Sequence, residues 1–184
     1  AVVMTTAVSS DARTHATRMQ AKEISGAFGE LHLTRLASDP DGNLRDVAVL
    51  LYTTGTTGDP KGVMLSHGNM CFGGIASANL RKMTPDDVIY GVLPLTHVFG
   101  LVSVVTGACS AGTMVQQEAR FSAQALYEAV MNGVTILPAV PQMHALVMQY
   151  AKEQGLTRLQ SPSLRYVSSG GAPLDPAWKR KAEA

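Results

Sequence analysis

The order of apolar and polar positions predicts strands that alternate with helices along the whole 184-residue chain. Short apolar runs bounded by glycine, proline or charged residues are typical of strands, and longer segments with apolar residues every three or four positions are typical of helices. The predicted strands cover residues 2–5, 30–36, 47–53, 88–93, 113–116, 134–137 and 164–169. The predicted helices cover residues 10–23, 66–82, 97–110, 121–131 and 141–154, and a last helix begins at Pro176.

This alternation predicts an α/β fold in which a largely parallel sheet is covered by helices. The run from Val47 to Leu51 is continuously apolar, which favours a strand buried on both faces. Ligands in such folds bind at the carboxyl ends of the strands, so the segments that follow predicted strands are the places to look for chemistry.

The segment from Tyr52 to Val63 follows one of these strands and suits a polyphosphate. It contains four threonines, three glycines and one lysine. Glycines let backbone N–H groups face an anion, threonine hydroxyls donate further hydrogen bonds, and the ammonium group of Lys61 neutralises charge. The Walker pattern does not fit the segment. The alternative is a plain polar turn, since threonine, glycine, aspartate and proline are ordinary turn residues.

Two further segments also follow predicted strands. The first, Leu93–Gly100, contains His97, and the second, Ser168–Leu174, contains the pair Gly170 and Gly171. Taken alone, the histidine would be interpreted as a structural residue and the glycine pair as a turn. A glycine-rich backbone also leaves room for a flat purine ring.

In this order, the three segments resemble the signatures of the adenylate-forming enzymes. This superfamily comprises acyl- and aryl-CoA synthetases, firefly luciferase and peptide-synthetase adenylation domains. The resemblance spans residues 52 to 174, roughly two thirds of the chain, and residues 1–45 carry no usable motif. It implies an α/β fold that forms part of the large N-terminal domain of such an enzyme.

The resemblance also implies residue roles. The β and γ phosphates of ATP would be held by Thr53, Thr54, Gly55, Thr56, Thr57, Gly58 and Lys61, with Thr57 meeting Mg²⁺. The adenine ring would lie against Gly171, Ala172 and Pro173, and the acid pocket would be lined by His97, Phe99 and Ser103. His97 would shape the pocket and donate a hydrogen bond near the substrate carboxylate rather than act as a base. No catalytic residue is assigned.

The implied activity is ATP-dependent activation of a carboxylic acid to an acyl-adenylate, followed by transfer to CoA as a thioester. ATP, Mg²⁺ and CoA would be required. Thr54 stands where the family often has serine, and Thr96 where an aromatic residue is common. The Gly55–Gly58 core is closer to acyl- and aryl-CoA synthetases than to peptide-synthetase domains. The acid (fatty, aryl or short-chain), the choice of CoA or a carrier protein as acceptor, and the oligomeric state stay open.

Three alternatives remain at this point. The chain could be a non-catalytic nucleotide-binding module, a peptide-synthetase-type adenylation domain, or an unrelated α/β domain with a structural threonine loop. The family's Tyr-Gly-x-Thr-Glu segment, its ribose-binding aspartate and its C-terminal domain with the adenylation lysine find no match in this chain. The expectation is therefore a single partial domain over residues 1–184 that is inactive alone and self-associates.

Composition excludes several other classes. The net charge is +1, which gives no electrostatic case for nucleic acid or an anionic membrane. Residues 88–117 carry no formal charge, but Pro94 and four glycines interrupt them, so residues 98–109 are expected to form a buried helix rather than a transmembrane one. No signal peptide is evident, so a cytoplasmic location is expected. Cys71 and Cys109 are expected to be small buried residues outside any disulfide.

Overall fold

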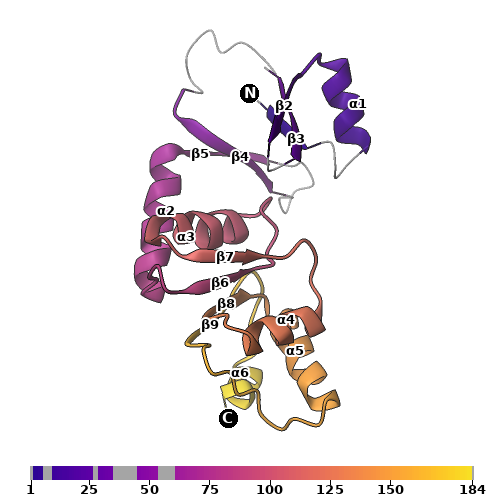
Figure 1. Ribbon diagram of the computed structural model, residues 1–184. Coiled ribbons are helices and arrows are strands. Elements are labelled where there is room, and N and C mark those ends of the chain that lie inside the picture. Colours follow the sequence, from indigo (N-terminus) through magenta and orange to yellow (C-terminus); the bar gives the residue numbers. More distant parts are fainter. Residues whose placement is uncertain (1, 6–9, 27–28, 35–44, 54–60, 184) are drawn as a thin grey trace. The chain divides into compact units, whose positions relative to one another are not determined.

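The computed structural model describes residues 2–5, 10–26, 29–34, 45–53 and 61–183. The predicted phosphate-binding residues Thr54, Gly55, Thr56, Thr57 and Gly58 lie outside this described part. The chain divides into two compact units, Ala1–Arg45 and Asp46–Ala184 (Figure 1). Whether both belong to one domain stays a prediction, and each unit is described by itself.

The first unit contains a three-stranded antiparallel sheet. Its elements are β1 (Val2–Thr5), α1 (Ser10–Arg18), β2 (Lys22–Gly26) and β3 (Gly29–Thr34), and the sheet order is β1-β3-β2. The predicted strand 2–5 is confirmed. The predicted helix 10–23 is wrong at its end, because Gln20 takes a left-handed conformation at φ 51° and the chain then forms β2.

The second unit begins with a hairpin of β4 (Val47–Thr53) and β5 (Lys61–Ser66). The two strands are antiparallel, and β4 is not buried on both faces as expected, because its exposed and half-buried residues alternate along most of its length. Only one face of β4 is covered by other residues, so the apolar side chains Leu50 and Tyr52 remain exposed on the other face. The strand β5 was not predicted, since it begins with Lys61 and Gly62, which continue the polar character of the preceding segment.

A four-stranded parallel sheet forms the centre of the second unit. Its strands are β6 (Val88–Gly91), β7 (Met114–Gln117), β8 (Ile136–Ala139) and β9 (Tyr166–Ser169), in the order β7-β6-β8-β9. All three strand pairs are parallel, which confirms the predicted sheet. The helices between these strands are η1 (Phe99–Thr106), α3 (Gly107–Ala111), α4 (Ala123–Met131) and α5 (Pro141–Glu153). The helix α2 (His67–Arg81) precedes β6, and α6 (Pro176–Glu183) follows β9.

The helix α2 shows how local sequence sets an element. The side chain of Ser66 accepts a hydrogen bond from the backbone N–H of Asn69, and the Asn69 side chain accepts from the backbone N–H of Ser66. This reciprocal pair satisfies two N–H groups that a helix start would otherwise leave without partners. The helix ends where Lys82 adopts a left-handed conformation, so the predicted bounds 66–82 hold to within one residue at each end, with Ser66 and Lys82 as the caps.

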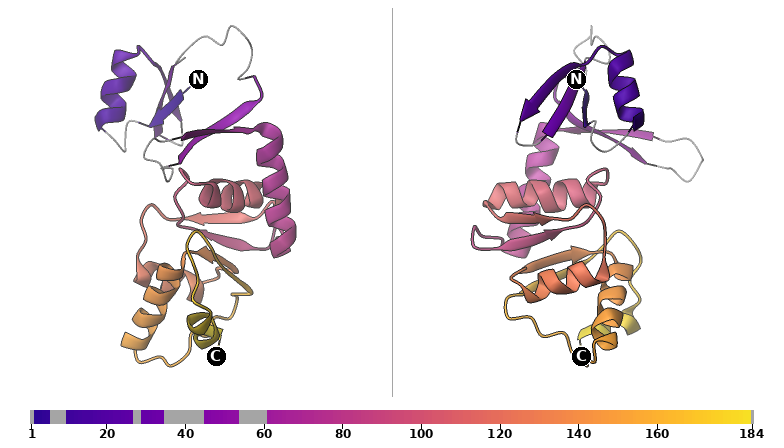
Figure 2. Two further views of the ribbon diagram at one scale, coloured as in Figure 1. Left: turned by 180° about the vertical axis from the view of Figure 1, so that it is seen from behind. Right: turned by 45° about the vertical axis from the view of Figure 1, so that its right-hand side comes forward.

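The parallel sheet has a hydrophobic core on each face, because successive residues of a strand point to opposite sides. On one face, Ile89 and Ile136 pack with side chains of α2, η1 and α3. On the other face, Tyr90 and Leu137 pack with side chains of α4 and α5. Figure 2 shows these two groups of helices on opposite sides of the sheet.

The uncharged segment after β6 forms the π-helix η1 and the short helix α3. Val102, Val104 and Ala108 are buried, as expected for a core helix. No helix within the described ranges combines the length and apolar character that crossing a bilayer needs. The two cysteines, Cys71 and Cys109, are a correction, because they are exposed. Other residues, among them Ala78 of α2 and Ala108 of α3, supply the buried positions of these helices.

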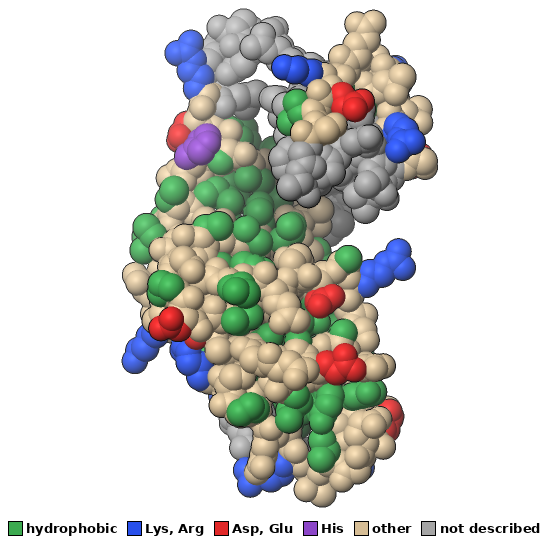
Figure 3. All heavy atoms as spheres, in the orientation of Figure 1, with side chains coloured by type: hydrophobic (Ala, Val, Ile, Leu, Met, Phe, Trp, Pro, Cys, Tyr) green, Lys and Arg blue, Asp and Glu red, His purple; other side chains and the backbone are tan. Residues whose placement is uncertain are grey.

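Apolar side chains remain exposed on the hairpin and on α2. Hydrophobic side chains gather at the surface of this part of the second unit (Figure 3). The exposed fractions include Tyr52 67%, Met64 58%, Phe72 77% and Leu80 71%. An exposed apolar area of this kind favours contact with another protein surface.

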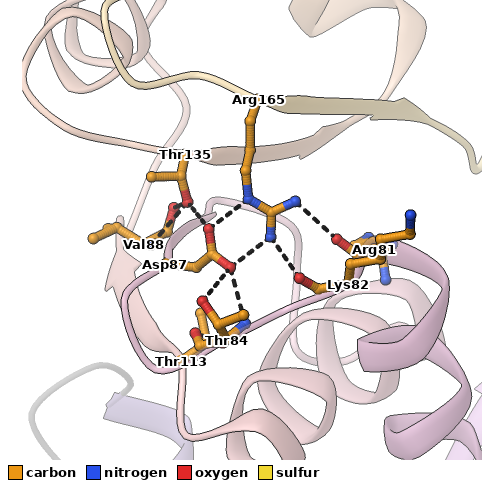
Figure 4. A network of polar contacts seen from close by, with 8 residues as sticks. All are labelled: Arg81, Lys82, Thr84, Asp87, Val88, Thr113, Thr135 and Arg165. Carbon is orange, nitrogen blue, oxygen red and sulfur yellow. Dashed lines mark hydrogen bonds and ion pairs between the residues drawn. The ribbon is translucent and has the colours of Figure 1, made fainter.

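A buried carboxylate joins the sheet to the end of α2. Asp87, directly before β6, is 4% exposed and accepts hydrogen bonds from Arg165 Nε at 2.7 Å and from Thr135 Oγ1 at 2.7 Å. It also accepts from the backbone N–H of Thr84 at 2.9 Å (Figure 4). Arg165 donates further to the carbonyls of Arg81 at 3.0 Å and Lys82 at 2.8 Å. The starts of β6, β8 and β9 are thereby held together with the end of α2.

We predict that Asp87→Asn destabilises the protein by about 2–4 kcal/mol at neutral pH, because it removes the charge that Arg165 and the surrounding donors require. Arg165 holds the pKa of Asp87 well below its usual range, and burial opposes this shift only in part. Since the folded pKa is the lower one, the carboxylate's contribution is complete above the unfolded value of about 3.9 and is lost as the pH falls through the folded pKa.

Urea unfolding from neutral to acidic pH checks this prediction. The control is Asp86→Asn, a neighbouring exposed carboxylate. The free-energy difference between wild type and Asp87→Asn should narrow below about pH 4, while Asp86→Asn should stay close to wild type throughout. An equal decrease in the free energy of unfolding for Asp87→Asn and Asp86→Asn would contradict the assigned role of Asp87.

Candidate functional site

A cavity of about 520 Å³ opens beside β9 and its following loop and beside the loop after β6. Residues from the loop after β6, from η1, from β9 and its following loop, and from the end of α2 meet there. The lining residues are Leu80, Arg81, His97, Val98, Phe99, Ser103, Tyr166, Ser168, Ser169, Gly170 and Gly171. Segments more than 60 positions apart in the sequence are thus brought to one place.

The topology of the sheet explains why the cavity lies at this position. The chain leaves β6 toward η1 on one face, whereas it leaves the neighbouring strand β8 toward α5, whose buried residues pack on the other face. Such a reversal leaves a crevice at the carboxyl ends of adjacent parallel strands, and ligands of open α/β sheets bind there.

The loop after β6 orients His97. The backbone N–H of His97 donates to the carbonyl of Pro94 at 3.1 Å, and the backbone N–H of Phe99 donates to His97 Nδ1 at 3.1 Å. Since Nδ1 accepts, the neutral imidazole carries its proton on Nε2. The ring is exposed, so Nε2–H is available to donate to a ligand oxygen in the cavity.

The loop after β9 brings bare backbone close to Phe99. The N–H of Gly170 donates to the carbonyl of Ala139 at 3.2 Å, which holds the loop against the end of β8. A Cβ atom at Gly170 would lie 3.0 Å from Phe99 Cε1, closer than side chains normally approach. Gly171 has φ +76°, a conformation that favours glycine. The glycine pair therefore forms a flat wall next to an aromatic ring.

At the hairpin, the structure describes only the two ends of the predicted phosphate loop. Thr53 and Lys61 are Cα partners in the ladder between β4 and β5, and both side chains are exposed. The predicted loop is therefore closed at its base by a strand pair. Among the described residues, no three His, Cys, Asp or Glu side chains cluster in a way that could hold a metal ion. The assignment of Thr57 to Mg²⁺ stays a prediction, since this residue is outside the described part.

The structure brings most of the other predicted site residues together. His97, Phe99 and Ser103, predicted for the acid, line the same cavity as Gly171, predicted for adenine. Ala172 and Pro173 follow Gly171 but do not line this cavity. The binding roles of all these residues stay predictions, whereas their proximity is a property of the fold.

Sequence reasoning missed two polar residues of the cavity, Arg81 and Tyr166. Arg81 is the last residue of α2 and Tyr166 the first of β9, so neither lies in a glycine-rich or histidine-containing segment. The basic residue at the end of α2 also fits an ordinary helix end, where cations are favoured. Only the packing of α2 against η1 reveals that this arginine is 5% exposed and faces a cavity.

A second cavity, of about 480 Å³, lies between α5, α6 and the strands β8 and β9. His144 and Trp178 line it together with mostly apolar side chains, and His144 Nε2 lies 3.1 Å from the carbonyl of Ser168. Burial lowers the pKa of His144, which favours the neutral ring as donor to that carbonyl. None of the predicted site residues lines this cavity.

Comparison with known proteins places the chain in a family. The model of the AMP-binding enzyme family matches residues 2–184, so the chain belongs to the AMP-binding enzymes. It is similar to 4-coumarate–CoA ligase 5 of Oryza sativa subsp. japonica, with 38% identity over 137 residues, which are 70% of this chain and 24% of the relative. The chain thus spans about a quarter of the length of this curated relative.

Solved structures agree with the fold. ATP-bound MatB from Rhodopseudomonas palustris matches with a TM-score of 0.68 and 31% identity, over 75% of this chain and 27% of that protein. O-succinylbenzoate coenzyme A synthetase (MenE) from Bacillus subtilis, in complex with ATP and magnesium, matches with a TM-score of 0.65 and 31% identity, over 74% and 28%. These similarities confirm the family resemblance and the fold class that were expected from the sequence. The similar 4-coumarate–CoA ligase, as its name says, joins an acid to CoA.

We predict that Gly171→Ala lowers the free energy of unfolding by about 1 kcal/mol, because alanine is disfavoured at positive φ. Its Cβ would make only ordinary contacts, 3.4 Å to Val140 and 3.8 Å to Phe99, so the cost comes from the backbone. Gly68→Ala, in the first turn of α2, is the matched control, since its nearest contact is 3.5 Å away and its φ is not positive. Urea unfolding measures both, and a loss as large for Gly68→Ala would contradict the argument.

Proposed function

We propose that the protein to which this chain belongs is an AMP-forming acid–CoA ligase. Its reaction would couple a carboxylic acid to ATP as an acyl-adenylate and then transfer the acyl group to CoA. The observation that carries this proposal is the single cavity where residues predicted for the acid meet the glycine segment predicted for adenine. Membership in the AMP-binding enzyme family and similarity to CoA ligases support it.

The phosphates of ATP are proposed to bind in the loop between β4 and β5, through Thr53, Thr54, Gly55, Thr56, Thr57, Gly58 and Lys61. Mg²⁺ would bind at Thr57 and the phosphates. The ladder pair of Thr53 and Lys61 supports this, because it places a hydroxyl and an ammonium group at the two ends of one short loop. The similar MenE structure contains ATP and magnesium.

The adenine ring is proposed to lie against the backbone of Gly171, Ala172 and Pro173, where the absence of side chains at the glycine pair leaves a flat surface. The acid would occupy the cavity beside Phe99 and Ser103, with its carboxylate near His97. The Nε2–H of His97 would donate to a carboxylate oxygen, which orients the acid without taking part in proton transfer. The chemistry would then depend on positioning and on neutralising phosphate charge.

The alternatives are less well supported. A non-catalytic nucleotide-binding module would not need an acid cavity next to the glycine segment. A peptide-synthetase-type adenylation domain would use a carrier protein instead of CoA, and the acceptor stays a prediction. A cytoplasmic location also stays a prediction. Self-association of the chain is proposed as well, supported by the exposed apolar side chains of the hairpin and α2.

We predict that the natural protein exchanges pyrophosphate into ATP only when a suitable carboxylic acid is present. Lys61→Ala should weaken ATP binding roughly 10- to 100-fold, because hydrogen bonds to a charged partner are lost. Thr57→Val, which removes a hydroxyl at similar volume, should act in the same direction. Isotope exchange with a broad acid panel and calorimetric titration of ATP measure the two effects.

The control is Lys152→Ala, which removes an exposed cation from α5 outside the loop and both cavities. It should bind ATP as wild type does. If Lys61→Ala and Thr57→Val also bind ATP normally, the loop does not hold the phosphates. If ATP binds but no acid supports exchange, the nucleotide-binding module becomes the better description.

A further inference from the structure

The cavity contains a buried cation that the proposed reaction does not use. Arg81 is 5% exposed and lines the cavity beside Ser103 and Tyr166. Its Nη1 donates to the carbonyl of Ser103 at 3.2 Å and to the side chain of Ser77. Both acceptors are neutral, and Nε has no hydrogen-bond partner within the described part of the chain.

No acidic side chain among the described residues compensates this charge. The cavity lining contains arginine, histidine, serine, tyrosine, glycine and apolar residues, but no aspartate or glutamate. The nearby Asp87 is engaged by Arg165, and the link from that network to Arg81 reaches the backbone carbonyl rather than the guanidinium group. A buried charge without a counter-ion is costly, and burial accordingly lowers the pKa of Arg81.

The position of Arg81 differs from that of His97. His97 is exposed on the loop after β6, near the glycine segment where adenine is proposed to bind. Arg81 instead lies in the buried wall formed by α2 and η1, since Ser103 and Ser77 hold it there. Both residues line one cavity, so an acid bound there with its activated carboxylate near His97 could place its other end near Arg81.

We propose that Arg81 selects acids that carry a second anionic group at the end remote from the activated carboxylate. This inference rests on the proposed acid–CoA ligase function and narrows its substrate class. The second carboxylate would accept hydrogen bonds from the Arg81 guanidinium group, and Nε–H is the donor that has no partner among the described residues. The hydroxyl of Tyr166, which lines the same cavity from β9, could donate to the same group.

Matched acids test the proposal on the natural protein. Straight-chain and aromatic dicarboxylates of graded length are compared with their monoamides, for example glutarate with glutaramic acid, by acid-dependent pyrophosphate exchange. Each pair has the same shape and differs in one charge. The best dicarboxylate should exceed its monoamide roughly 10- to 100-fold in kcat/KM, because a charged hydrogen-bonded partner is replaced by a neutral one.

Variants then separate selection from a structural role. Arg81→Met should abolish the preference for the dicarboxylate, and Arg81→Lys should restore part of it, because the charge remains while the guanidinium geometry is lost. Arg120→Met, at an exposed arginine that lines neither cavity, should leave the preference unchanged. A purely structural arginine would lower the activity with both acids of a pair equally.

The outcomes are distinguishable. Exchange that is equal for both members of every pair, or better with the monoamide, overturns the role of Arg81 and leaves the ligase function standing. This comparison needs only the wild-type protein, so it holds even if Arg81→Met does not fold. Absence of exchange with every acid overturns the proposed function and this inference with it.

Discussion

The ion pair between Asp87 and Arg165 is the interaction on which the central sheet of the second unit depends. The carboxylate is buried at the start of β6, and the guanidinium group reaches it from the start of β9, 78 positions later in the chain. Thr135 joins the same carboxylate from the start of β8. Parallel strands have no tight turn to fix their register, so polar contacts of this kind at one edge define how the strands align.

This alignment has its consequence at the opposite edge. Because the amino ends of β6, β8 and β9 are held together, the three segments that follow these strands begin next to one another at the carboxyl ends. The loop after β6 contributes His97, η1 begins with Phe99, and the loop after β9 contributes Gly170 and Gly171. The cavity begins at these carboxyl ends and extends along β9 toward its amino end, since Tyr166 and Arg81 also line it. Phe99 lies next to the glycine segment, because a Cβ atom at Gly170 would be 3.0 Å from Phe99 Cε1.

Local signals made much of this predictable from the sequence. The capping residue Ser66, the helix-starting Pro141 and the apolar runs of β6, β8 and β9 act within a few residues, so the elements were found at nearly their observed bounds. The strands β2 and β5 were not predicted, because their sequences are polar or contain glycine. These segments form strands by pairing with the neighbouring strands β3 and β4. The same limit applies to Arg81, whose burial arises from contacts with Ser103 that no local pattern encodes.

The two parts of the proposed site therefore differ in how they are encoded. The proposed phosphate contacts come from one continuous segment, whose ends are the paired residues Thr53 and Lys61, so a change in any other element has little reason to alter them. The proposed acid cavity is assembled from α2, η1 and β9, so single substitutions on any of these can change its shape or charge while the nucleotide segment stays intact. In the proposed function, a fold arranged in this way can keep the reaction with ATP while the acid that it accepts changes. The buried Arg81 is the residue of this chain at which a substitution would change the charge of the proposed acid cavity.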